Sequence, residues 1–181
     1  STVRIYDAEL AALNGGAGNY AGATLTLARD GGANPQDLFD LDTTGASFTL
    51  VGGTLQSSGQ TFATLNTTGG TLTLSFTDSG TAPTQALVNE VLSRITYANS
   101  SSTPPASVQI DWTFNDGNTA TQGAGGAQTA IGYTTVSITA VNDAPVITST
   151  ATVSVPENGT AVTTVTASDA DGDALTYSLA G

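Results

Sequence analysis

The chain has 181 residues and a formal net charge of −12, from fifteen acidic residues, three arginines and no lysine or histidine. This balance argues against a nucleic-acid partner, which needs clustered basic side chains, and makes cations the expected counterpart. The absence of cysteine excludes disulfides and thiolate metal sites. Without histidine, cysteine or lysine there is also no ordinary base to activate a nucleophile, so we expect no enzyme.

The N-terminal part carries a helical turn followed by strand patterns. Asp7 is a typical helix-capping residue and Gly15 a typical stop, so residues 7–13 are predicted to form a short helix. Apolar and polar residues then alternate, which is typical of half-buried antiparallel strands. Clusters of glycine, asparagine and aspartate separate these strands, which are predicted at residues 23–29, 48–51, 61–65 and 71–76.

A second helix interrupts the strands. Residues 84–95 place apolar side chains at helical spacing from Leu87 to Ile95, and this stripe has the width needed to pack on a sheet. Strand patterns resume at residues 108–114 and 133–141. Many short strands at this spacing predict an all-β fold, a β-sandwich with one or two short helices.

The segment Asn142-Asp143-Ala144-Pro145 marks a domain boundary, because proline prevents the preceding strand from continuing as a central strand. Residues 1–141 are predicted to form the first domain and residues 142–145 a linker. Residues 146–181 then hold the first strands of a second sandwich, too few to bury a core. We therefore expect a fragment of a longer repeat protein, whose C-terminal strands pair with another copy of the chain or with the first domain. These strands are predicted at residues 146–147, 152–155, 161–167 and 175–179.

Four motifs follow one another from the linker onward: Asn142-Asp143-Ala144-Pro145, Pro156-Glu157-Asn158, Ala167-Ser168-Asp169-Ala170-Asp171 and Leu175-Thr176-Tyr177-Ser178-Leu179. In this order they resemble the linker and first strands of cadherin and bacterial cadherin-like repeats. The similarity is greatest to the cadherin-like or VCBS-type tandem repeats of giant RTX-type surface adhesins. It implies immunoglobulin-like (cadherin-like) β-sandwiches joined end to end, calcium-binding linkers and an extracellular location on a bacterial cell surface.

The resemblance also implies calcium ligands. Asn142 and Asp143 would contribute from the linker, and Asp169 and Asp171 from the following domain. Asp173 adds a third carboxylate within five residues, and such hard oxygen ligands suit Ca²⁺. Two further groups complete the candidate metal ligands: Glu157, which matches a ligand of the next linker downstream, and the first-domain acids at or near turns, Asp7, Glu9, Asp78 and Asp116.

The resemblance leads to an expected function, a calcium-rigidified extender module of a large bacterial cell-surface adhesin. Two alternatives stay open: a carbohydrate- or peptide-binding adhesion domain, since residues 1–140 exceed an ordinary immunoglobulin-like sandwich, and a fibre or surface-layer subunit assembled by strand complementation. The expected partners are calcium, adjacent repeats of the same polypeptide and a glycan or protein receptor. No membrane insertion is expected, because no segment has the ~20 consecutive apolar residues of a span.

Overall fold

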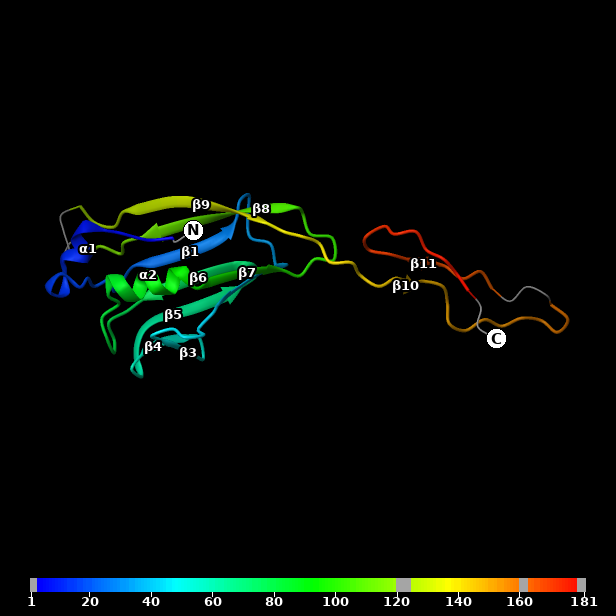
Figure 1. Cartoon of the computed structure of the whole chain (residues 1–181), viewed down its shortest axis with the longest axis horizontal. Helices are drawn as coiled ribbons and strands as arrows, with labels where there is room; N and C mark the ends of the chain where they lie inside the picture. Colours follow the sequence, from blue (N-terminus) through cyan, green and yellow to red (C-terminus); the bar gives the residue numbers. More distant parts are fainter. Residues whose placement is uncertain (1–2, 120–124, 160–162, 179–181) are drawn as a thin grey trace. The chain divides into compact units, whose positions relative to one another are not determined.

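The computed structural model describes residues 3–119, 125–159 and 163–178, and the chain divides into two compact units (Figure 1). The first unit comprises Ser1–Ser100 and Ser107–Ser137, and the second comprises Ser101–Ala106 and Ile138–Gly181. The change of unit thus falls between Ser137 and Ile138, whereas the sequence suggested a boundary four residues later, after Val141.

A seven-stranded antiparallel sheet forms the first unit, with the strand order β3–β4–β5–β6–β1–β8–β9 (Figure 1). Strands β3 and β9 are its edges. All neighbours pair antiparallel, as the alternating patterns predicted. The strands are β1 (Thr24–Arg29), β3 (Thr49–Val51), β4 (Thr54–Ser57), β5 (Gln60–Thr68), β6 (Thr71–Phe76), β8 (Ser107–Asn115) and β9 (Thr129–Ser137).

The remaining elements of this unit are a two-stranded antiparallel sheet and short helices. Strand β2 (Asp37–Leu41) pairs with β7 (Ile95–Asn99), and β2 contacts β5 and β6 of the large sheet. Both predicted helices are present, α1 (Ala8–Ala12) and α2 (Gln85–Ser93), and a 3-10 turn, η1 (Asn14–Gly16), follows α1. The side chains of Asp7 and Thr84 cap their N-termini, so the predicted cap at Asp7 is confirmed.

The core lies on one face of the large sheet, and the all-β class predicted from the sequence is confirmed. Leu25 on β1 lies between Leu74 on β6 and Phe114 on β8, and all three are buried. Helix α2 adds Val88, Val91 and Leu92. Strands β2, β4 and β7 were not predicted, and the strand expected at residues 133–141 begins earlier and ends at Ser137.

The second unit holds a single strand pair among its described residues. Strand β10 (Val146–Ile147) pairs antiparallel with β11 (Ala167–Ser168). Residues 152–155 and 175–178, which were predicted as strands, adopt no regular structure, and residues 160–162 and 179–181 lie outside the described residues. The physical reason is a lack of burial, because the large apolar side chains of this unit are exposed: Val146, Ile147, Val153, Val155, Val165 and Tyr177.

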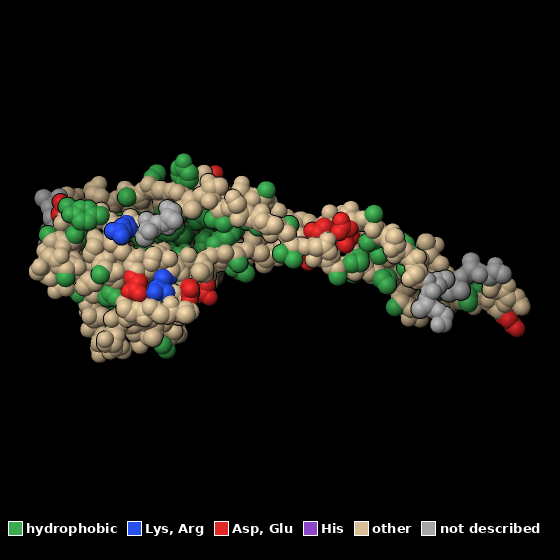
Figure 2. Space-filling view, in the orientation of Figure 1, with side chains coloured by type: hydrophobic (Ala, Val, Ile, Leu, Met, Phe, Trp, Pro, Cys, Tyr) green, Lys and Arg blue, Asp and Glu red, His purple; other side chains and the backbone are tan. Residues whose placement is uncertain are grey.

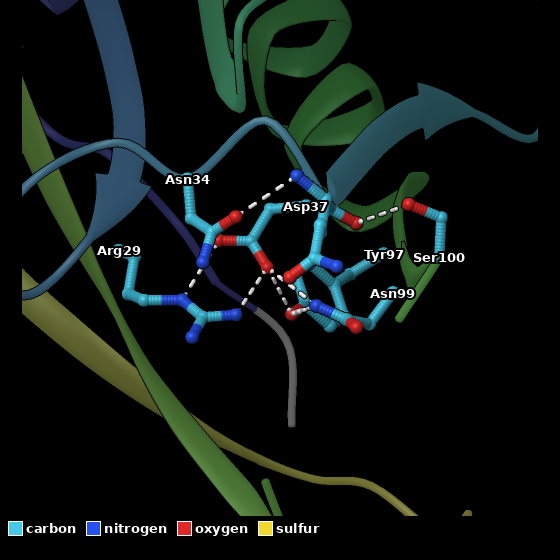
Figure 3. A network of polar contacts seen from close by, with 7 residues as sticks. Arg29, Asn34, Asp37, Tyr97, Asn99 and Ser100 are labelled. Carbon is cyan, nitrogen blue, oxygen red and sulfur yellow. Dashed lines mark hydrogen bonds and ion pairs between the residues drawn. The ribbon is translucent and has the colours of Figure 1, made fainter. Parts of the chain in front are cut away.

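A buried ion pair joins the two sheets of the first unit (Figure 3). Arg29 on β1 donates to the carboxylate of Asp37 on β2, from Nε at 2.9 Å and from Nη2 at 2.5 Å. Tyr97 Oη and Asn99 Nδ2, both on β7, donate to the same carboxylate at 2.6 and 2.9 Å. Burial would raise the pKa of Asp37, but the hydrogen bonds from Arg29, Tyr97 and Asn99 and the guanidinium charge outweigh it and hold this pKa below its usual value.

We expect removal of the Asp37 carboxylate to be costly, because it leaves the Arg29 guanidinium, 20% exposed, without its partner. Asp37→Ala should lower the free energy of unfolding of the first unit by about 3–5 kcal/mol, measured by urea denaturation. The matched control is Asp40→Ala, an exposed acid on the same strand, which should change it by less than about 0.5 kcal/mol. Equal losses at the two positions would contradict the role of the ion pair.

Asp37 should also make stability depend on pH. Because the folded-state pKa is lowered, its contribution is complete above the unfolded-state pKa of about 3.9 and is lost as the pH falls from there through the folded-state pKa. The difference in unfolding free energy between the native protein and Asp37→Ala should therefore be constant from about pH 7 to 5 and shrink below about pH 4. Urea denaturation at stepped pH measures it, and a difference that stayed constant in acid would disprove the assignment.

Candidate cation-binding sites

Acidic side chains gather in a loop of the second unit (Figure 2). Asp169 organises this loop, because its Oδ1 accepts hydrogen bonds from the backbone N–H groups of Asp171 at 2.9 Å and Asp173 at 3.3 Å. Aspartate favours such turns, in which its side chain bonds to the backbone two residues on. Gly172 supplies the positive φ of 78° within the turn.

The loop is tied to the predicted linker. Asp171 Oδ2 accepts a hydrogen bond from the backbone N–H of Asp143 at 2.6 Å, and Asn142 Nδ2 donates to the carbonyl of Asp143 at 3.2 Å. The β10–β11 pair explains this proximity, because antiparallel pairing brings the segment before β10 next to the segment after β11. We call Asn142, Asp143, Asp169, Asp171 and Asp173 the junction cluster.

The junction cluster offers carboxylate and amide oxygens, which are the ligands that a hard cation prefers. Residues 142–181 contain no basic side chain that would neutralise these carboxylates. Asp143 and Asp169 are half-buried, and the other members are exposed. Across the part of the chain that the structure describes, no group of three or more Asp, Glu, His or Cys side chains is arranged to hold a metal ion. In the junction cluster the carboxylates of Asp169 and Asp171 bind backbone N–H groups instead.

Glu157 lies in a separate turn. The backbone N–H of Gly159 donates to the carbonyl of Pro156 at 3.0 Å and closes this turn, in which Asn158 has a φ of 65°. None of the hydrogen bonds among the described residues joins Glu157 to the junction cluster. The assignment of Glu157 to the next linker downstream remains a prediction.

A second group of acids lies in the first unit. Asp7, Glu9 and Asp116, which the sequence suggested only as acids near turns, line one pocket of about 120 Å³. We call it the acidic pocket. Asp78, named on the same grounds, does not line it and instead accepts a hydrogen bond from Asn19 Nδ2 at 3.4 Å. The other lining residues are Leu10, Asn118, Gly126 and Gln128.

Backbone hydrogen bonds hold Asp116 in place. Its Oδ1 accepts from the N–H of Asn118 at 3.0 Å and from that of Gln128 at 2.9 Å. The N–H of Asp116 in turn donates to the carbonyl of Gln128 at 3.1 Å. Asp116 is only 7% exposed, so its carboxylate links the end of β8 to the approach to β9 inside the unit.

Asp7 is fixed by its role at the start of α1. Its Oδ1 accepts from the N–H of Leu10 at 2.8 Å, and its own N–H donates to Tyr20 Oη at 3.3 Å. Tyr20 Oη donates in turn to Gln85 Oε1 on α2. Burial raises the pKa of Tyr20 above its usual value. Sequence reasoning missed Tyr20 and Gln85, because no local pattern links residues so distant in the chain.

The acidic pocket lies at one end of β9 and the chain leaves the first unit at the other. Gln128 directly precedes β9 at the pocket, and Ser137 ends both β9 and the unit. Nine residues of extended strand cover about 30 Å. The pocket therefore belongs to the end of the first unit that is remote from its exit at Ser137.

No family model matches the chain, and searches of curated proteins and of solved structures also find no match. Within the described ranges, none of the helices combines the length and apolarity needed to cross a membrane.

The two hydrogen bonds to Asp116 Oδ1 lead to a prediction. Asp116→Ala removes the acceptor of two backbone N–H groups and should lower the free energy of unfolding by about 1–3 kcal/mol. Asp116→Asn keeps an oxygen at this position and should cost less than about 1 kcal/mol. Urea denaturation measures both, and amide hydrogen exchange at Gln128 locates the effect. If both variants were destabilised equally, the carboxylate would not act through these bonds.

Proposed function

We propose that the chain is a calcium-rigidified extender module of a large bacterial cell-surface adhesin, working outside the cell. In this proposal the first unit is an immunoglobulin-like, cadherin-like sandwich, and the second is the beginning of the next module. The observation that carries the proposal is the hydrogen bond from the Asp143 N–H to the Asp171 carboxylate. It joins the predicted linker to the acidic loop of the following module, which is where the motifs suggested a shared calcium site.

Charge supports calcium as the ion. Three aspartates occur within residues 169–173, and their mutual repulsion favours a bound cation. Among the described residues, no hydrogen bond engages Oδ2 of Asp169 or Oδ1 of Asp171, so each carboxylate retains an oxygen for a ligand. Asp143, Asp169 and Asp171, with the amide oxygen of Asn142, would hold the ion. Calcium takes six to eight such oxygens, and extracellular modules bind it with dissociation constants of about 10⁻⁴ to 10⁻³ M.

The acidic pocket supports a role within an array of modules. Asp7, Glu9 and Asp116 gather at the end of the first unit that is remote from its exit. A preceding module would reach that end in a tandem protein. Two domains joined by a few residues move relative to each other by default. Acidic side chains before the first strand and again at the linker would let bound cations stiffen the junction at each end of the first unit.

The direct test is removal of calcium. We expect millimolar calcium to raise the melting temperature of the second unit and to increase the maximum dimension measured by small-angle scattering, relative to EDTA. Magnesium should substitute poorly, because it dehydrates reluctantly and requires a tighter octahedral site. If calcium changed neither quantity, the extender proposal would be disproved.

Substitutions locate the effect. Asp171→Ala should abolish most of the calcium response, because it removes the carboxylate that meets the Asp143 N–H. Glu157→Ala is the matched control, since it removes one acid from the same unit outside the junction cluster, and it should leave the response unchanged. Isothermal titration calorimetry and thermal melting measure both variants. An equal loss in the control would mean that Glu157 binds the same ion.

A further inference from the structure

Strand β9 is a long and open edge of the large sheet. It pairs with β8 through nine residues without a register shift, from Asn115 opposite Thr129 to Ser107 opposite Ser137. On its other side no strand of the described residues pairs with it. At the opposite edge, β3 has only three residues, so β9 is the edge with room for an added strand.

A hydrogen bond made by Gln128, the residue just before β9, shows which backbone N–H and C=O groups of β9 point away from the sheet. Asp116 N–H donates to the carbonyl of Gln128, and this pair continues the β8–β9 register. Hydrogen-bonded pairs alternate with non-bonded pairs in antiparallel ladders, so the even-numbered residues of β9 bond to β8. The N–H and C=O groups of the odd-numbered residues therefore point away from the sheet: Thr129, Ile131, Tyr133, Thr135 and Ser137.

Three of the devices by which proteins block strand addition are missing from β9: charged residues, proline and a bulge. Residues 129–137 contain no charged residue and no proline, and the register with β8 shows no bulge. Ile131 and Tyr133 are 85% and 70% exposed. Long edges without such protection are templates for pairing with another chain.

We propose that β9 pairs antiparallel with β9 of a second copy of this chain, about a two-fold axis at Tyr133. The axis passes through Tyr133, the middle residue of the strand. The outward-facing N–H and C=O groups of the two Tyr133 residues therefore form hydrogen bonds with each other. Ile131 then faces Thr135, and Gly132 faces Thr134, so no pair of the added ladder brings two charged residues of β9 together. This surface is independent of calcium and of the junction cluster.

Charge favours a second copy as the occupant. A chain with a net charge of −12 repels its own copies, yet β9 is a nine-residue surface strand without any of the fifteen acids. On β8, Asp111 lies directly opposite Tyr133 in the β8–β9 register. Two such aspartates would lie three strand spacings apart in the dimer, about 14 Å, which is beyond the Debye length at physiological salt.

The dimer should be weak, because one strand pair buries less than the ~1,200 Å² of a stable interface. Sedimentation velocity of the full chain in EDTA, from micromolar to millimolar concentration, should show a monomer–dimer equilibrium. Tyr133→Lys places two like charges at the axis and should raise the dimer dissociation constant at least tenfold. Val51→Lys adds the same charge at an exposed position on β3, the other edge, and should leave the constant within about twofold.

A cysteine substitution tests the register. The chain contains no cysteine, so Tyr133→Cys introduces a unique thiol. Hydrogen-bonded antiparallel partners have Cα atoms about 5.5 Å apart, within the reach of a disulfide. Oxidation should therefore give a covalent dimer of Tyr133→Cys and none of Val51→Cys, with thermal melting showing that both variants are folded. A monomer at every concentration, undiminished association of Tyr133→Lys or failure of Tyr133→Cys to cross-link would overturn the proposal.

Discussion

The ion pair between Arg29 and Asp37 holds the first unit together. Strand β2 directs Asp37, Phe39 and Leu41 inward, so a carboxylate occupies a position where alternation would place an apolar side chain. Such a charge is tolerated only because the guanidinium and two donors from β7 surround it. The same contacts attach the small sheet to β1, a central strand of the large sheet, and they make the relation between the two sheets specific.

The distribution of basic side chains follows from this arrangement. Arg94, near the end of α2, lies 3.5 Å from Glu90 and donates to the carbonyls of Thr44 and Gly45. In the described ranges the only ion pairs are this one and Arg29–Asp37. Two of the three arginines therefore serve the packing of the first unit, whereas the aspartates of the acidic pocket and of the junction cluster accept hydrogen bonds from backbone N–H groups.

Local patterns predicted the elements that bury one regular face, such as β6 and α2, because burial imposes a period on the sequence. Strand β2 escaped prediction because Asp37 interrupts its apolar face and the compensating Arg29 lies on another strand. Strand β7 was not predicted because Ile95, its first residue, continues the apolar spacing of the preceding helix. Asp7 and Asp116 could be named from nearby turns, but their meeting in one pocket depends on β8 ending beside α1, which no local pattern encodes.

The attachment of β9 has a mechanical consequence. The chain leaves the first unit at Ser137, at the end of strand β9, whose nine residues pair with β8 and whose even-numbered residues bond to it. Hydrogen bonds in an antiparallel ladder run perpendicular to the strands. A pull along the axis of β9 would therefore load all of these bonds at once in shear, and a pull across the axis would break them one after another from Ser137. The resistance of the unit to tension thus depends on the direction in which the next segment draws it.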